Sequence, residues 1–251
     1  MNKFFYTYKW VLTQKIVAFF SLIAFPTFCI RCGKQTSGAV LCNDCIQKHL
    51  MTWENRDTRC KICGRRLISE THICLECREK PVFKHADAVF PIHRYVLWKK
   101  QLMFLWKGSS KRLLSPVFAK MVYKVLCEQY PDIPVVPVPP RKGKIRKKGW
   151  DQIAELVMIL HCMYNVTVIN ALVHTDQNQQ KKRNRKERLA QLNTSFKIAP
   201  KYKDNKKELL PKKVVLVDDV ITTGTTIESC ASCLKKSGVK TVYALTLFEV
   251  S

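Results

Sequence analysis

Residues 214–226 read Val-Val-Leu-Val-Asp-Asp-Val-Ile-Thr-Thr-Gly-Thr-Thr and join an apolar run to a polar turn. The four apolar residues Val214 to Val217 predict a strand that is buried on both faces, as in a parallel sheet. A helix is expected directly after the turn, over 225–237. Ligands of such sheets bind beyond the carboxyl ends of the strands, so this run predicts both a fold class and the place of a site.

The polar turn has the chemistry of a sugar phosphate site. Two adjacent carboxylates, Asp218 and Asp219, cost stability through mutual repulsion unless they bind hydroxyls or a metal ion. The turn offers backbone N–H groups and hydroxyls at a helix N-terminus, which suits a phosphate monoester. Its residues are Thr222, Thr223, Gly224, Thr225 and Thr226. Carboxylates for ribose hydroxyls beside such a cradle predict a ribose 5-phosphate site.

The carboxyl-terminal part of the chain alternates expected strands with expected helices. The helices cover 111–130, 150–163 and 225–237, and the strands cover 133–138, 166–173, 196–198, 214–217 and 240–250. This alternation predicts an α/β domain over 81–251, with a mostly parallel sheet and helices on both faces. The apolar helical patterns include Cys127, Cys162, Cys230 and Cys233, which we expect to be core residues.

Eight further cysteines form a duplicated pattern. Cys29, Cys32, Cys42 and Cys45 recur as Cys60, Cys63, Cys74 and Cys77, at offsets of 31, 31, 32 and 32 residues. Four thiolates complete a closed tetrahedral shell around a structural zinc ion. We therefore expect about two zinc ions in a double zinc ribbon over 29–80. Disulfides and an iron–sulfur cluster are alternatives, and the spacing allows ligands to pair within each unit or across the two.

The amino-terminal residues 1–28 contain an apolar segment, Ile16 to Phe28. It is shorter than the roughly 18 residues that a membrane-spanning helix needs, so we expect no transmembrane helix. A signal peptide is an alternative, but no A-x-A-like cleavage site follows. We expect a short helix that ends at Phe25-Pro26 and packs on a neighbouring domain, in a cytoplasmic protein that is free or associated with the membrane.

The chain of 251 residues is strongly basic, since 44 Lys and Arg against 19 Asp and Glu give a net charge of +25. Two runs, Arg141 to Lys148 and Lys181 to Arg188, each hold six cations in eight residues. They are compatible with solvated loops, but a groove that follows a nucleic-acid backbone uses such runs. Trp150, after the first run, can stack on a base or begin the buried face of its helix.

Four motifs resemble the ComF competence family: FPTFCIRCG at 25–33, VPVPPRKGKIRKKGWDQ at 136–152, QKKRNRKERLAQLNTSF at 180–196, and 214–226. The last also resembles the phosphoribosyl pyrophosphate (PRPP) motif of type I phosphoribosyltransferases. The resemblance implies that Asp218 and Asp219 hold the ribose hydroxyls, that the Thr222 to Thr226 turn holds the 5-phosphate, and that Mg²⁺ bridges pyrophosphate and ribose oxygens. It places Arg141 and Lys148 in the pyrophosphate loop.

Some residues depart from that family pattern. The family usually has Arg-Gly-Phe-Asn where this chain has Lys148-Gly-Trp-Asp151, and it favours Asn where Gln191 stands. Lysine replaces a bidentate phosphate donor by a point charge, which loosens the assignment of the pyrophosphate contacts. No amino-terminal nucleophilic cysteine or glutaminase domain is present in the sequence, so an amidotransferase would lack its ammonia source.

Two functions of different classes follow. The first is a cytoplasmic competence protein that engages single-stranded DNA during uptake, with PRPP as ligand and with other DNA-uptake proteins at the inner face of the membrane as partners. The alternative is a glycosyltransferase of nucleoside metabolism, which transfers ribose 5-phosphate from PRPP to a nucleobase or another nitrogen nucleophile. The zinc ribbons and the +25 charge favour the first.

Overall fold

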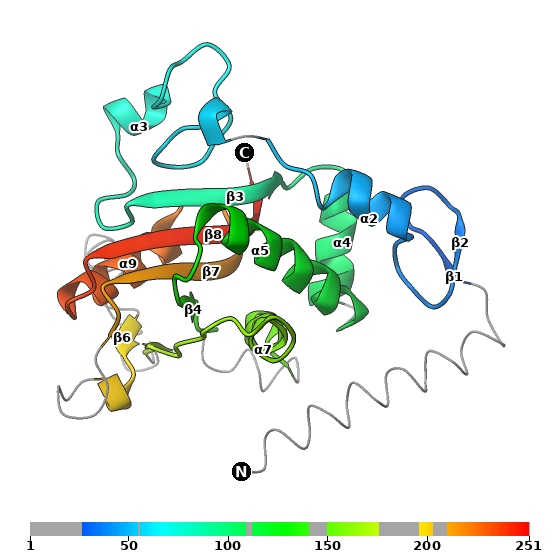
Figure 1. Cartoon of the computed structure of the whole chain (residues 1–251). Helices are drawn as coiled ribbons and strands as arrows, with labels where there is room; N and C mark the ends of the chain where they lie inside the picture. Colours follow the sequence, from blue (N-terminus) through cyan, green and yellow to red (C-terminus); the bar gives the residue numbers. More distant parts are fainter. Residues whose placement is uncertain are drawn as a thin grey trace, which may run out of the picture. The chain divides into compact units, whose positions relative to one another are not determined.

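The computed structural model describes residues 27–54, 56–108, 112–140, 150–175, 196–202 and 210–250. The chain divides into two compact units, Met1–Thr52 and Trp53–Ser251 (Figure 1). In the first unit, β1 (Thr27–Phe28) pairs antiparallel with β2 (Gln35–Thr36), and α2 (Asn43–His49) follows. The end of the expected apolar segment is therefore a strand, and the rest of that segment lies outside the described residues.

The second unit is built on a parallel sheet of four strands in the order β3–β8–β7–β4. These strands are β3 (Ala88–Arg94), β8 (Thr241–Glu249), β7 (Lys213–Ile221) and β4 (Val135–Pro137), and each neighbouring pair is parallel. One face carries α9 (Thr225–Lys236), whereas α5 (Ser115–Gln129) and α7 (Gln152–Tyr164) lie on the other (Figure 1). The predicted parallel sheet with helices on both faces is confirmed.

The α9 face shows why the helix periodicity was informative. Ile227, Cys230, Ala231 and Leu234 are buried in one cluster with residues of β7 and β8. Burial, and then the nearby charge of Asp218, raise the pKa of the Cys230 thiol well above its ordinary value. The prediction of a core cysteine is confirmed for Cys230.

The same prediction is wrong for Cys127 and Cys162, which are exposed, and Cys233 is only partly buried. In α5 the buried face includes Val122, Val125 and Leu126, and Cys127 is turned away from it. In α7 the face ends at Leu160, so Cys162 lies on the solvent side. An apolar composition of the helix therefore did not place every residue of it in the core.

One predicted strand, 166–173, is mostly absent from the main sheet. Val168 makes a single bridge to Val135, and the chain then forms β5 (Leu172–His174), which pairs antiparallel with β6 (Phe196–Ile198). Apolar side chains of this separate two-stranded sheet pack into the α9 cluster. Burial against α9 explains the apolar run without a fifth parallel strand.

One further α-helix and two 3₁₀ turns belong to this unit. Helix α4 (Trp98–Lys107) follows β3, and the 3₁₀ turn η2 (Arg112–Leu114) leads into α5. The 3₁₀ turn η4 (Pro200–Tyr202) follows β6. Helix α4 was not expected from the sequence, and it brings Lys107 to the carboxyl end of β7.

The second cysteine module, with η1 (Arg56–Thr58) and α3 (Leu75–Glu79), packs directly on β3. Buried Arg59 donates hydrogen bonds to the carbonyl oxygens of Gly64, Pro91 and Ile92 at 3.2, 2.6 and 3.3 Å. The Val89 N–H donates to the Ile62 carbonyl at 2.8 Å. These hydrogen bonds join the second cysteine module to the sheet. The predicted domain boundaries at residues 28 and 80 stay predictions.

We expect Arg59→Met to destabilise the second unit by about 3 kcal/mol, because three buried carbonyl groups lose their donor. For a domain of this size, that change lowers the melting temperature by roughly 6–12 °C. The control is Arg66→Met, which removes an exposed ion pair with Glu54 and should shift the midpoint by less than about 2 °C. Equal midpoints for the two variants in thermal unfolding would show that Arg59 does not hold the module on the sheet.

Candidate functional site

The candidate site lies where β7 turns into α9. The strand extends to Ile221, so Asp218 and Asp219 lie within it rather than after it. Successive side chains of a strand point to opposite faces. Asp219 accordingly meets Lys107 of α4, with Oδ2 and Nζ 2.7 Å apart, whereas the charge of Asp218 acts on Cys230 of α9. The two carboxylates therefore serve opposite sides of the sheet.

Local contacts relieve the repulsion expected between these neighbours. The Asp219 backbone N–H donates to Oδ1 of Asp218 at 2.8 Å. Asp219 is 9% exposed, and the Lys107 ammonium balances its charge. One ion pair and one backbone hydrogen bond thus offset the repulsion between the two neighbouring carboxylates.

The turn after β7 has the backbone that the cradle requires. Gly224 is the N-cap of α9 and has φ +75°, in the left-handed region where glycine carries no steric cost. A Cβ atom there would lie 2.5 Å from Cζ of Phe83. The hydroxyls of Thr223 and Thr225 lie 2.9 Å apart, and the side chains of Thr222 and Thr226 point to a solvent-exposed surface. The predicted cradle residues are thus gathered at one open helix N-terminus.

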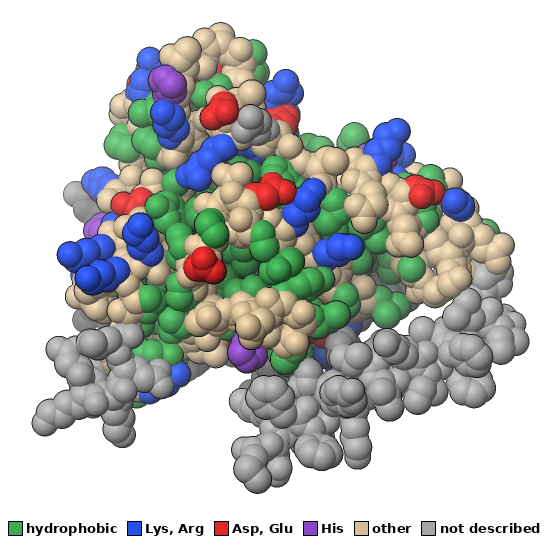
Figure 2. Space-filling view, in the orientation of Figure 1, with side chains coloured by type: hydrophobic (Ala, Val, Ile, Leu, Met, Phe, Trp, Pro, Cys, Tyr) green, Lys and Arg blue, Asp and Glu red, His purple; other side chains and the backbone are tan. Residues whose placement is uncertain are grey.

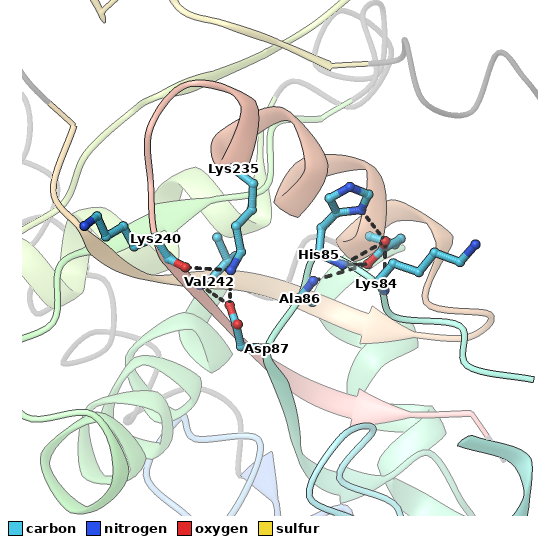
Figure 3. A network of polar contacts seen from close by, with 8 residues as sticks. Lys84, His85, Ala86, Asp87, Lys235, Lys240 and Val242 are labelled. Carbon is cyan, nitrogen blue, oxygen red and sulfur yellow. Dashed lines mark hydrogen bonds and ion pairs between the residues drawn. The ribbon is translucent and has the colours of Figure 1, made fainter. Parts of the chain in front are cut away.

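A carboxylate of α9 accepts hydrogen bonds from the segment that precedes β3 (Figure 3). Glu228, in the first turn of α9, accepts from the backbone N–H groups of Lys84, His85 and Ala86 at 3.0, 3.0 and 3.3 Å. Nδ1 of His85 lies 2.6 Å from Oε1 of the same carboxylate. The segment just before β3 is therefore fixed on the helix that carries the cradle.

The same segment is held a second time at its end. Oδ2 of Asp87 accepts from the Val242 N–H and pairs with Nζ of Lys235, both at 2.7 Å (Figure 3). Nζ of Lys235 also donates to the Lys240 carbonyl at 2.6 Å. Residues 84–87 are therefore tied to both ends of α9.

A buried polar network supports the opposite side of the sheet. Glu155 of α7 is 6% exposed and accepts from Nε of Arg112 and from the Ser115 hydroxyl, both at 2.9 Å. The Ser115 oxygen accepts from the Trp106 indole at 2.8 Å. Trp106 directly precedes Lys107, so this network fixes the end of α4 from which Lys107 reaches Asp219.

The structure places Trp150 in this packing. Its ring lies edge-on to Trp106, with centroids 6.3 Å apart, and the Arg112 guanidinium lies 5.6 Å from its centre. Asp151 is the N-cap of α7 and accepts from the Ile153 N–H at 3.1 Å. Aspartate and asparagine are both preferred at such a capping position. Of the two interpretations of Trp150, the structure favours the packed one.

The cationic residues expected to contact pyrophosphate and nucleic acid are not among those that the structure describes. Arg141, Lys148 and both six-cation runs lie outside the described residues. On the face drawn in Figure 2, the described Lys and Arg side chains lie singly or in small groups between acidic and hydrophobic ones. The contacts of Arg141 and Lys148 with pyrophosphate stay predictions.

The eight repeated cysteines form two separate groups of four. Cys29, Cys32, Cys42 and Cys45 gather in one group, and Cys60, Cys63, Cys74 and Cys77 in the other, with the sulfurs of each group within 4.8 Å of one another. This arrangement selects pairing within each unit over the cross-braced alternative. The Sγ atoms of Cys32 and Cys42, and those of Cys63 and Cys74, lie 3.7 Å apart. Tetrahedral Zn–S bonds of about 2.3 Å require S–S separations of about 3.8 Å, so both groups fit a zinc ion.

Backbone hydrogen bonds prepare one thiolate in each group. Burial acts to raise the pKa of Cys29, but hydrogen bonds from the backbone of Cys42, Cys32 and Arg31 outweigh it and lower that pKa to about 6. The same competition in the second group lowers the pKa of Cys60 to about 7. Burial raises the pKa of Cys45 to about 12. Cys29 and Cys45, whose pKa values differ this much, can both be thiolates near neutral pH only beside a cation, and a zinc ion is such a cation.

Three residues of the site were not found from the sequence. Lys107 was missed because a cation at a helix C-terminus ordinarily complements the helix dipole. Glu228 was missed because an acidic residue in a first turn is ordinary for the same reason. Phe83 follows the cysteine module closely and carries no pattern that would place it against Gly224.

Comparisons with known proteins agree with this geometry. Residues 154–251 match the phosphoribosyl transferase domain family. The chain is 27% identical over 210 residues to "Competence protein ComFC" of Streptococcus pneumoniae, which covers 82% of this chain and 86% of that protein. It is 25% identical over 212 residues to "Competence protein F" of Haemophilus influenzae, covering 80% and 87%. The resemblance to the ComF competence family is confirmed, and the chain carries a phosphoribosyltransferase domain.

In the part of the chain that the structure describes, no helix combines the length and the apolar character needed to cross a bilayer.

We expect the purified protein to carry two zinc ions, one per cysteine group, in metal analysis. Cys32→Ser combined with Cys45→Ser should remove one of them, because the second group keeps its own four ligands. Cys127→Ser combined with Cys162→Ser is the matched control and should retain both ions, since these exposed thiols belong to neither group. Wild-type protein with no zinc, or with these eight thiols oxidised after mild purification, would contradict the assignment.

Proposed function

We propose that this ComF-like chain is a cytoplasmic competence protein that binds PRPP with Mg²⁺ at the β7–α9 turn and engages single-stranded DNA through its basic loops. One observation carries the proposal: Asp218 lies on the α9 side of β7, next to a glycine-opened helix N-terminus lined by threonine hydroxyls. The competence role is supported by the two named relatives, each of which matches most of this chain.

A sugar phosphate fits the turn for physical reasons. Free N–H groups at the start of α9 and its dipole favour a dianionic 5-phosphate. The phosphate oxygens also need hydrogen-bond donors, and the hydroxyls of exposed Thr222 and Thr226 can supply them. Asp218, at the strand end, then lies on the side where a ribose attached to that phosphate presents its hydroxyls.

The two carboxylates take different roles in this proposal. Asp218 binds the ribose hydroxyls directly, because it faces the helix that carries the cradle. Asp219 is engaged by Lys107 on the other face of the sheet and keeps that cation near the carboxyl end of β7. An ammonium held there also attracts the negatively charged pyrophosphate, at close range where screening is weak.

Magnesium would enter with the ligand. Mg²⁺ prefers oxygen ligands and binds through one or two carboxylates plus substrate phosphates, and the Asp218 side chain is a donor of that kind. When bound it neutralises pyrophosphate charge. This chain's own contribution is to orient the ribose at Asp218 and the phosphate at the Thr222 to Thr226 turn.

DNA binding is proposed from charge. One small ligand does not need twelve cations in two short runs, whereas a phosphate backbone does. Because Trp150 packs against Trp106, the proposed contacts are electrostatic rather than base stacking at that residue. We further propose partners among DNA-uptake proteins at the inner face of the membrane.

The alternative is an enzyme, and the phosphoribosyltransferase domain favours it. A nitrogen nucleophile of a nucleobase would form a bond to the anomeric carbon of PRPP as the bond from that carbon to pyrophosphate breaks. The nucleophile would lose a proton, and pyrophosphate would leave with the electron pair. Cations beside the departing pyrophosphate, such as Lys107, would stabilise its charge.

We expect PRPP with Mg²⁺ to raise the melting temperature of the wild-type protein. A ligand that binds only the native state at a hundredfold excess over its Kd stabilises by roughly 2.7 kcal/mol. Asp218→Asn combined with Asp219→Asn should abolish the shift, because both carboxylates lose their charge. Of the single variants, Asp218→Asn should lose more of it, since only Asp218 faces the cradle.

The matched control is Asp132→Asn, an exposed turn residue with φ +59° before β4, where asparagine is well tolerated. It should keep the full thermal shift. An unchanged shift in the double variant would place the ribose elsewhere, and no shift in the wild type would remove PRPP from the proposal.

We expect single-stranded DNA to bind with strong salt dependence and little sequence preference. The logarithm of the binding constant should fall against the logarithm of salt concentration with a slope near −0.7 per phosphate contacted. Neutralising Lys181, Lys182 and Arg183 together should flatten the slope by about two units, while the PRPP-induced thermal shift persists.

The same titration separates the two functions. Negligible DNA affinity at low salt, together with transfer from PRPP to a nucleobase, would reject the DNA-binding proposal and leave the enzyme.

A further inference from the structure

We propose that Glu228 is a positioning residue for the 5-phosphate cradle, and that through it the zinc occupancy of the second cysteine group controls the affinity for PRPP. The inference rests on the proposed PRPP site and adds a regulatory partner to it. Its structural basis is the segment between Cys77 and β3, which contacts the cradle on one side and continues from the zinc module on the other.

The first step is the contact with the turn itself. Phe83 lies against Gly224, and Val82 also comes within van der Waals reach of that position. Gly224 has a left-handed backbone that sets the direction of the first N–H groups of α9. If Phe83 is displaced, Gly224 loses the side chain that packs against it, and the geometry of the cradle depends on Gly224.

The second step is the carboxylate of Glu228. It is 16% exposed and accepts backbone hydrogen bonds from three consecutive residues of another segment, as well as contacting the His85 ring. Because a charged acceptor with several N–H donors forms strong hydrogen bonds, residues 84–86 and the first turn of α9 move as one body. The residues of this network are not the ones proposed to bind the phosphate, so we infer that the network positions the cradle.

The third step connects that body to the metal. Residues 82–86 follow Cys77 closely along the chain. The zinc module also forms hydrogen bonds with β3, the strand that comes after these residues. Ile62, inside a C-x-x-C pair, bonds to Val89, and Arg59 holds the carbonyls of Pro91 and Ile92. A Cβ at Gly64 would overlap the Val89 carbonyl oxygen, so the module and β3 are in close backbone contact.

Loss of zinc releases both attachments at once. Four-thiolate modules of this size depend on the metal for their folding free energy. Without the ion, the segment that carries Phe83 and the N–H groups for Glu228 is no longer anchored at its amino-terminal end. The first cysteine group lies in the other compact unit.

The test uses the reciprocity of coupled binding, in which each ligand changes the affinity of the other by the same factor. With wild-type protein, PRPP and Mg²⁺ should raise the zinc affinity of one of the two sites by about fivefold or more in competition with a chromogenic chelator. Glu228→Gln should keep both zinc ions but lose most of this increase and weaken PRPP binding. Glu128→Gln, an exposed residue of α5, is the matched control and should change neither.

Two cysteine variants separate the modules. Cys45 and Cys77 hold equivalent positions in the repeat and are 7% and 6% exposed, so Cys45→Ser and Cys77→Ser are closely matched. Cys77→Ser should weaken PRPP binding by about tenfold, and Cys45→Ser by less than about twofold, measured by calorimetry.

The outcomes distinguish this inference from the proposed function. PRPP mixed with the Asp218→Asn, Asp219→Asn variant controls for zinc bound by free PRPP, and no change in zinc affinity is expected there. A wild-type thermal shift with unchanged zinc affinity, or equal losses in the two cysteine variants, would overturn the coupling alone. No thermal shift in the wild type would overturn the PRPP site and the coupling together.

Discussion

The left-handed backbone at Gly224 is the constraint on which the rest of the site depends. Gly224 is the last of the three residues, 222–224, that separate the end of β7 from the start of α9, so the strand that carries the carboxylates and the helix that offers its N–H groups lie next to each other. A side chain at this position would strike Phe83. The glycine therefore serves two needs at once: a positive φ for the turn, and room for a segment from a distant part of the chain.

Charge is balanced around this point by pairs rather than by solvent. Asp219 is matched by Lys107, and Glu155 by Arg112, each across two different helices or strands. Buried charges are costly unless each is paired and hydrogen-bonded. At the corner between α4 and α5, the Glu155 carboxylate meets this requirement through Arg112 and Ser115. In a chain with a net charge of +25, Asp219 and Glu155 thus each hold a cationic side chain in a fixed position.

The sequence predicted the parts of the fold whose signal is local. The apolar run at Val214, the helical spacing of Cys230 and the C-x-x-C pairs each report on a few neighbouring residues, and all three are confirmed. Prediction failed where partners distant in sequence decide the outcome. Leu172 joins a small antiparallel sheet because α9 offers it a buried surface, and Cys127 faces solvent because the partners of α5 lie on its other side.

The site divides in the same way. The residues proposed to bind the ligand lie between Asp218 and Thr226, and they form a motif that can be recognised in the sequence. Lys107, Phe83 and Glu228 reach the site only through tertiary contacts, and their types are ordinary for surface positions. No periodicity or spacing marks them, because the sheet order that brings them together is a property of the whole chain.

The strand order also sets how this protein must be made. The first strand of the sheet, β3, lies at its edge and pairs with β8, the last strand that the structure describes. During synthesis β3 leaves the ribosome long before its partner exists, and an apolar strand with free N–H and carbonyl groups invites aggregation. The module that precedes it already bonds to Val89 and covers the carbonyls of Pro91 and Ile92. We therefore expect this cysteine module, which is made just before β3, to protect that strand from aggregation until the carboxyl-terminal strand has been made.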